Sequence, residues 1–218
     1  EYMNALVGPT LQEMFFIQYP EKLWGIPTTA LDANWAPKRI QIRETRAAFY
    51  QGQWAAVGKN GSLSILKELE RKFLAVGGQI LFGTEVTEIN CELDHVVDFQ
   101  INGVTRIKTE DSCVINTLPL DVTMPLCGQA CHLRYRGVAL VYVESKKRCP
   151  LGDGVDFLYS DDQGVLFNRV SDQNSFVEPE ISGPIYETIL CCEVTYSEGD
   201  EVARMSDEVL SAVVREGL

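Results

Sequence analysis

The chain has 218 residues, of which 45% are hydrophobic and 23% charged, and it carries a formal net charge of −12. This balance is that of a globular protein long enough to bury a core without disulfides or metals, so it excludes a disordered chain. An acidic surface repels DNA, RNA and anionic lipid, which excludes a general role on those partners. The longest apolar runs, such as residues 138–143, are far shorter than the roughly 20 residues of a membrane-spanning helix. No export signal is visible, and we expect a cytoplasmic protein.

The N-terminal third is predicted to be helical. Apolar residues in the segment 2–19 suit helical segments that are interrupted near Gly8 and Pro9. The clearest helix runs from Gly61 to Gly78, where an apolar stripe recurs at intervals of three and four residues and a pair of glycines ends the pattern.

From residue 79 onward the pattern changes to short strands. Asn102-Gly103 between two of them is a strong hairpin signal. A last helix is predicted at about 198–214, so helices are followed by an antiparallel or mixed sheet and then a helix, which is the α+β class. The expected strands are 79–82, 85–89, 96–101, 104–108, 113–116, 133–144, 155–159, 165–171 and 186–196.

The seven cysteines are an odd number without the regular spacing of a disulfide framework, which favours reduced thiols. Cys127, Cys131, His132 and Cys149 are the best metal-ligand candidates, but their spacing is not that of a zinc site. We therefore expect no metal.

Two arginines are the best candidates for binding an anion. Arg39 and Arg43 are four residues apart and share one face of either a helix or a strand. Two guanidinium groups on one face can bind a phosphate or carboxylate. The alternative is that they are solvated side chains paired with acids such as Glu44. No Walker motif, dinucleotide-binding glycine motif or catalytic triad is found, and the residues alone identify no catalytic acid or base.

Several stretches nonetheless resemble bacterial FAD-dependent oxidoreductases related to amine oxidases, protoporphyrinogen oxidases and UDP-galactopyranose mutase. The similarity covers nearly the whole chain. It is carried by residues 21–27 (EKLWGIP), 31–36 (LDANWA), 38–40 (KRI), 61–89, 113–120 (CVINTLPL), 133–136 (LRYR), 167–171 (FNRVS) and 193–205.

This resemblance implies that the chain is the substrate-binding part of a longer flavoprotein. The glycine-rich unit that holds most of the FAD lies outside it, so FAD is expected only in the intact parent. Residues 1–60 would form a helical substrate cap, residues 61–120 would adjoin the missing FAD domain, and residues 121–218 would form the substrate-domain sheet and terminal helix.

The resemblance also implies roles for particular residues. Four would bind a small-molecule substrate: Trp24, Arg39, Arg43 and Arg169. Three would approach the cofactor: Val86, Thr117 and Pro119.

The predicted function is therefore the substrate-binding domain of an amine-oxidase-like FAD-dependent oxidoreductase, inactive when isolated. One alternative is a mutase-like flavin-dependent isomerase of a nucleotide sugar for cell-surface polysaccharide (LPS) synthesis. Another is a non-catalytic interaction domain. In the isolated fragment, strands that the missing flavin domain would normally cover are expected to favour self-association through sheet edges or the exposed apolar surface.

Overall fold

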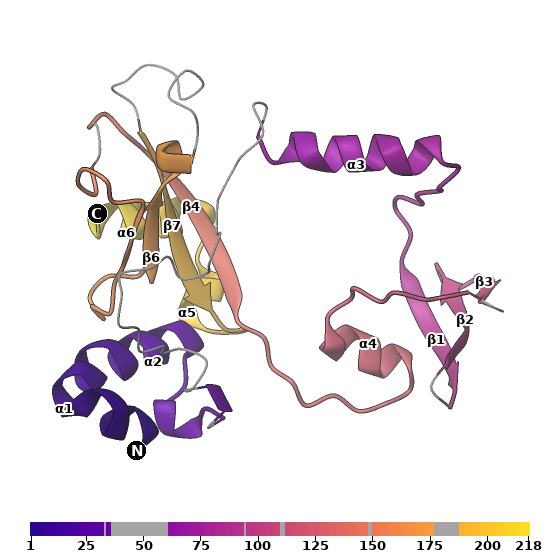
Figure 1. The fold of residues 1–218 in the computed structure, drawn as a ribbon, viewed down its shortest axis with the longest axis horizontal. Coiled ribbons are helices and arrows are strands. Elements are labelled where there is room, and N and C mark those ends of the chain that lie inside the picture. Colours follow the sequence, from indigo (N-terminus) through magenta and orange to yellow (C-terminus); the bar gives the residue numbers. More distant parts are fainter. Residues whose placement is uncertain (33, 36–60, 94, 110–111, 148–149, 177–187) are drawn as a thin grey trace. The chain divides into compact units, whose positions relative to one another are not determined.

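The structure is a computed structural model that describes residues 1–32, 34–35, 61–93, 95–109, 112–147, 150–176 and 188–218 (Figure 1). The chain divides into two compact units. Unit 1 consists of residues 1–65 and 136–218, and unit 2 consists of residues 66–135.

Unit 1 begins with short helices: α1 (Tyr2–Phe16), α2 (Gln18–Trp24) and the 3-10 turn η1 (Thr28–Ala30). Gly8 has a positive φ of 81° and kinks α1 just before Pro9, which confirms the predicted interruption. Gly25 ends α2 in the left-handed conformation, and its N–H donates to Glu21 O at 2.7 Å.

The rest of unit 1 is built on a four-stranded antiparallel sheet in the order β4-β7-β6-β5. The strands are β4 (Gly137–Ser145), β5 (Phe157–Tyr159), β6 (Arg169–Asp172) and β7 (Thr188–Tyr196). A 3-10 turn, η3 (Gln173–Phe176), follows β6, and two helices end the chain, α5 (Glu201–Arg204) and α6 (Asp207–Glu216).

The core of unit 1 lies on one face of this sheet. Val141, Cys192 and Val170 are aligned across β4, β7 and β6, and they pack with Val194 and with Val214 of α6. Because strand side chains alternate between faces, the next aligned row lies on the opposite face. That row is Leu140, Glu193, Arg169 and Tyr159.

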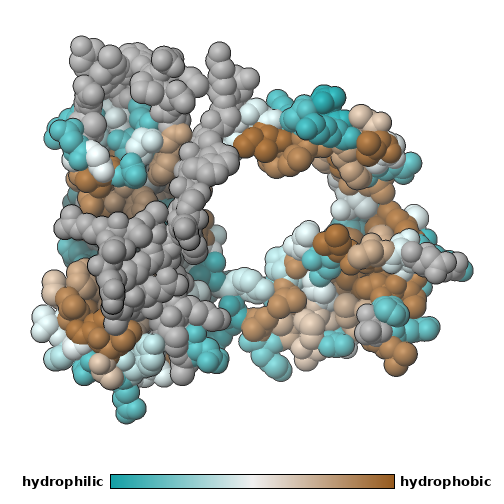
Figure 2. Space-filling view, viewed as in Figure 1, coloured by the Kyte–Doolittle hydropathy of each residue, from teal (hydrophilic) through white to brown (hydrophobic). Residues whose placement is uncertain are grey.

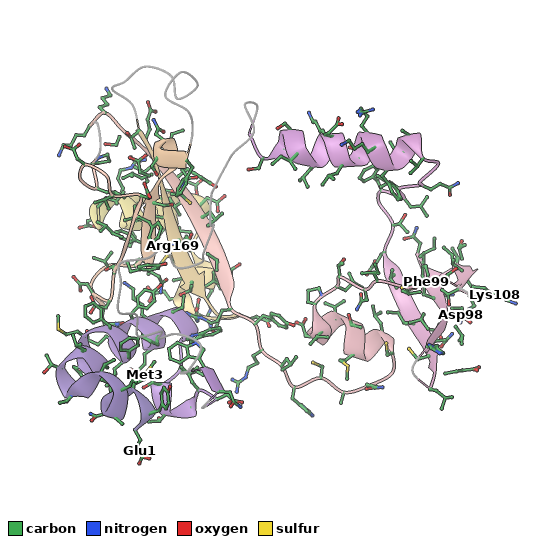
Figure 3. All side chains as sticks on the ribbon, viewed as in Figure 1. Glu1, Met3, Asp98, Phe99, Lys108 and Arg169 are labelled. Atoms are coloured by element: carbon green, nitrogen blue, oxygen red, sulfur yellow. The ribbon has the colours of Figure 1, made fainter. Side chains whose placement is uncertain are left out.

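Unit 2 contains a three-stranded antiparallel meander of β1 (Val86–Glu92), β2 (His95–Ile101) and β3 (Thr105–Lys108). Helix α4 (Leu120–Leu126) contacts β1. Asn102 and Gly103 both have positive φ, which confirms the predicted hairpin turn. Asp98 and Lys108 are paired across β2 and β3 (Figure 3). Among its described residues only Thr109 is buried, so this unit has little core.

Helix α3 (Leu63–Ala75) confirms the predicted 61–78 helix and spans the division between the units. Its apolar stripe is exposed. Leu66, Leu69 and Phe73 keep 61%, 58% and 47% of their surface accessible, and Figure 2 shows one side of the helix apolar and the other hydrophilic.

The α+β class is confirmed, with three predicted elements wrong. Residues 79–82 and 113–116 are not strands, since no described strand pairs with them and a single strand leaves its backbone groups unsatisfied. The last helix is two helices, because Ser206 adopts an extended conformation and its side chain accepts from Val209 N to start α6. None of the described helices is long and apolar enough to cross a membrane.

Candidate functional site

A cavity of about 750 Å³ lies in unit 1, within the size range of small-molecule sites. The helical wall comes from α1 and α2. The opposing wall comes from the sheet face that does not carry the core, together with the segment after β5. The residues that line the cavity are Met14, Phe15, Phe16, Tyr19, Pro20, Leu23, Trp35, Val138, Phe157, Leu158, Tyr159, Asp161, Asn168, Arg169, Glu193 and Thr195.

Aromatic rings join the two walls of the cavity. Tyr19 of α2 meets Tyr159 of β5 edge to face, with ring centroids 5.3 Å apart. Phe157 and Tyr159 form a second edge-to-face pair at 5.4 Å. Such rigid aromatic surfaces suit a flat, largely apolar ligand group.

Arg169 and Glu193 form the charged part of the wall. Arg169 Nε donates to Glu193 Oε1 at 2.9 Å, and Arg169 Nη2 donates to the same oxygen. The hydrogen bond to Glu193 raises the pKa of Arg169 above its ordinary value. The guanidinium also lies 5.9 Å from the ring centroids of both Phe157 and Tyr159. Its charge is therefore already compensated within the wall. Figure 3 labels Arg169 on the sheet of unit 1.

Asn168 is nearly completely buried beside this pair, with 2% of its surface exposed. Its Oδ1 accepts from Thr195 N at 3.1 Å, which fixes the orientation of the amide because a backbone N–H can only donate. Asn168 Nδ2 then has no hydrogen-bond partner among the described residues. A buried donor without an acceptor is costly, because it has lost the hydrogen bonds that water would supply.

Two cations attach the helical wall to the sheet. Lys22 Nζ donates to the carbonyl oxygens of Asp162 and Phe167 at 2.7 and 2.8 Å, and burial lowers the pKa of Lys22 although Asp162 opposes the shift. Arg136 donates to Leu23 O at 3.2 Å and to Ser197 Oγ at 2.7 Å. These bonds hold α2 in place and so maintain the cavity.

The residues predicted to bind substrate fall in three places. Arg169 lies in the cavity wall. Trp24 is the last residue of α2 and is 36% exposed, whereas its neighbour Leu23 is the one that lines the cavity. Arg39 and Arg43 lie outside the described residues.

The residues predicted to approach the cofactor are all in unit 2. Val86 is the half-buried first residue of β1. Thr117 is exposed, and Pro119 is the exposed residue that precedes α4. Among the described cysteines, histidines and acids, no group could hold a metal ion.

Sequence reasoning missed much of the cavity. Tyr19, Phe157 and Tyr159 read as ordinary apolar positions of helices and strands. Glu193 offered a signal, because it is a charged residue inside the otherwise apolar strand 189–194. Asn168 lay within one of the segments that carried the resemblance, but no role followed from it.

The fold is thus a helical segment on one face of an antiparallel sheet, with a second unit built on a strand meander. A comparable arrangement occurs in a solved structure described as reduced UDP-galactopyranose mutase, with a TM-score of 0.72 and 14% sequence identity. The match covers 99% of this chain and 50% of that one, so this chain spans about half of the mutase length. No protein-family model and no curated protein matches the sequence. At this identity the likeness shows the fold alone.

Proposed function

We propose that the chain is the substrate-binding part of a larger FAD-dependent oxidoreductase of the amine-oxidase-like class, and that the cavity of unit 1 is its substrate site. The single observation that carries the proposal is this cavity, walled by aromatic side chains and by the compensated Arg169–Glu193 pair. The likeness in fold to half of a UDP-galactopyranose mutase supports it.

The described residues do not by themselves fit FAD. A dinucleotide is held at a glycine-rich turn between a parallel strand and a helix. Both described sheets are antiparallel, and Thr117 and Pro119 are exposed. Within the proposal, unit 2 supplies the contacts of Val86, Thr117 and Pro119 to a cofactor that is held mainly by the rest of the parent protein. No step of the reaction is assigned to these residues.

The work of this chain would then be binding and orientation. Tyr19 and Tyr159 enclose a flat substrate group and exclude water from it. The Arg169–Glu193 pair presents a dipole without a net charge, which favours a neutral group over a free anion at this point of the wall. The location that we propose for the protein, from the sequence, is the cytoplasm.

The second candidate is a mutase-like, flavin-dependent isomerase of a nucleotide sugar. The name of the solved structure of similar fold favours it. A diphosphate needs uncompensated cations, and Arg169 is already paired with Glu193. Under this alternative the grip on the diphosphate would fall chiefly to Arg39 and Arg43. Arg43→Ala would then weaken UDP binding at least tenfold, corresponding to the loss of about 1.4 kcal/mol from one charge-assisted hydrogen bond.

A non-catalytic interaction domain is the alternative from another class. The exposed stripe of Leu66, Leu69 and Phe73 on α3 favours it, since exposed apolar patches mark surfaces that another protein segment covers. The same stripe would suit the missing FAD domain of the parent or self-association of the fragment.

One set of experiments separates the three. The full-length protein is purified, its FAD content is read from the visible spectrum, and UDP-galactopyranose is offered to the reduced enzyme. Bound FAD with no isomerisation and no UDP binding supports the oxidoreductase, and isomerisation supports the mutase. A colourless protein that takes up no FAD contradicts both and leaves the interaction domain.

A further inference from the structure

Glu193 engages the donors through which Arg169 would otherwise bind an anion. The two residues lie directly opposite each other in the register of β6 and β7. Arg169 donates from both Nε and Nη2 to Glu193 Oε1, so both nitrogens of one edge of the guanidinium are used. Such an edge, with two parallel donors, is the part of an arginine that binds a carboxylate or phosphate bidentately. Glu193 therefore competes directly with any anionic ligand for Arg169.

The guanidinium is nevertheless within reach of a ligand. Arg169 and Glu193 both line the cavity, and 38% of the Arg169 side chain is accessible. Its position does not depend on Glu193 alone, because it also lies 5.9 Å from the ring centroids of Phe157 and Tyr159. Without the charge of Glu193, the wall would therefore present a cation with free donors.

The charged side chains of the lining act together against an anion. They are Arg169, Glu193 and Asp161, which set one positive charge against two negative ones. Asp161 and Glu193 carry the same charge in the same wall, but both hydrogen bonds from Arg169 to a carboxylate go to Glu193. Removing the charge of Asp161 would change the net charge of the lining by the same amount without releasing the guanidinium.

We propose, on the basis of the proposed function of the cavity as a substrate site, that Glu193 is its specificity-determining residue. By engaging Arg169, Glu193 makes this part of the wall accept an uncharged substrate group and reject a carboxylate or phosphate. An anion would have to displace Glu193, or share one guanidinium with it and meet its repulsion. The group bound here is then flat and neutral, in keeping with the edge-to-face rings of Tyr19 and Tyr159.

The test compares two flat probes of nearly equal shape, neutral benzamide and anionic benzoate, by isothermal titration calorimetry on the full-length protein. The readout is the ratio of their dissociation constants, because a general loss of binding or of folded protein affects both probes alike. Wild type should favour benzamide. Glu193→Gln should shift the ratio toward benzoate about tenfold or more, since the released guanidinium can form charge-assisted hydrogen bonds with the anion.

Two further variants show whether the released guanidinium causes the shift. Asp161→Asn is the matched control, because it removes an equal charge from the same wall, and it should shift the ratio less than about threefold. Arg169→Met added to Glu193→Gln removes the cation itself. The double variant should return the ratio to within about threefold of the wild-type value.

Four outcomes would overturn the proposal while leaving the cavity as a substrate site: wild type favours benzoate, Glu193→Gln leaves the ratio unchanged, Asp161→Asn shifts it equally, or the shift persists in the double variant. Binding of neither probe to wild type would contradict the substrate site of the proposed function and the role of Glu193 with it. The FAD content is not part of the readout, so a failure of the flavoenzyme assignment is detected separately.

Discussion

Arg169 and Glu193 face each other across β6 and β7, and the guanidinium donates twice to one carboxylate oxygen in the wall of the cavity. The pair is partly exposed, with 38% and 24% of the two side chains accessible. The ion pair is partly screened by solvent, so it contributes less to the free energy of unfolding than its short contacts alone would suggest. Its structural value is to hold the guanidinium against the rings of Phe157 and Tyr159.

Glu193→Gln should lower the free energy of unfolding by about 1 kcal/mol, because the amide keeps a hydrogen bond to Arg169 but loses the opposite charge. Urea unfolding followed by circular dichroism measures the loss. Glu144→Gln, on an exposed position of β4, is the matched control and should change the stability by less than about 0.5 kcal/mol. Equal effects of the two substitutions would show that the ion pair is not specifically stabilising.

Gly25→Ala should destabilise unit 1 by more than the usual cost of a positive φ. Gly25 has a φ of 67°, and an added Cβ would lie 2.6 Å from Arg136 Nη1, which holds α2 to the sheet. Gly199→Ala is the control, since Gly199 also lies in unit 1, has a φ of 77° and has nothing within 4 Å of an added Cβ. We expect about 1 kcal/mol for Gly199→Ala and at least about twice that for Gly25→Ala. Thermal unfolding compares the two variants, and equal losses would contradict the role given to Arg136.

Cys192 should make the stability of unit 1 depend on pH in the alkaline range. Burial raises the pKa of Cys192 from 9.0 to about 12. The native thiol therefore keeps its proton where the unfolded one has lost it, so the contribution is complete below pH 9 and is lost as the pH rises toward 12. The slope is at most about 1.4 kcal/mol per pH unit.

The measurement is urea unfolding of wild type and Cys192→Ala between pH 8 and 11. The stability advantage of wild type should shrink as the pH rises. Cys113→Ala, which alters an exposed thiol, should show a constant difference from wild type over the same range. A constant difference for Cys192→Ala would mean that its thiol ionises equally in both states.

Local patterns predicted the local structure well. The Gly8 kink, helix α3 and the Asn102-Gly103 turn each depend on residues close together in sequence. Residues 79–82 and 113–116 were wrongly predicted as strands because a strand is decided by whether a partner is present, which a short apolar run does not reveal.

The cavity could not be predicted from local patterns, because it is formed by residues that are distant in the sequence. Arg169 and Glu193 are separated by 24 positions, and Tyr19 and Tyr159 come from the two separate sequence segments of unit 1. Their pairing follows from strand register and helix docking, which no local spacing encodes. The resemblance to flavoproteins named Arg169, which lies in the cavity wall, but its compensation by Glu193 was visible only in the fold.

The flavin spectrum of the full-length protein during substrate titration tests whether unit 1 holds the substrate of a flavoenzyme. We expect bound FAD whose absorbance is perturbed by substrate in wild type and in Tyr142→Ala, which alters an exposed tyrosine outside the cavity. In Tyr159→Ala the FAD should remain, with the perturbation shifted to at least tenfold higher substrate concentration, the equivalent of about 1.4 kcal/mol of lost aromatic contact. A protein without FAD, or an unchanged titration in Tyr159→Ala, would contradict the claim.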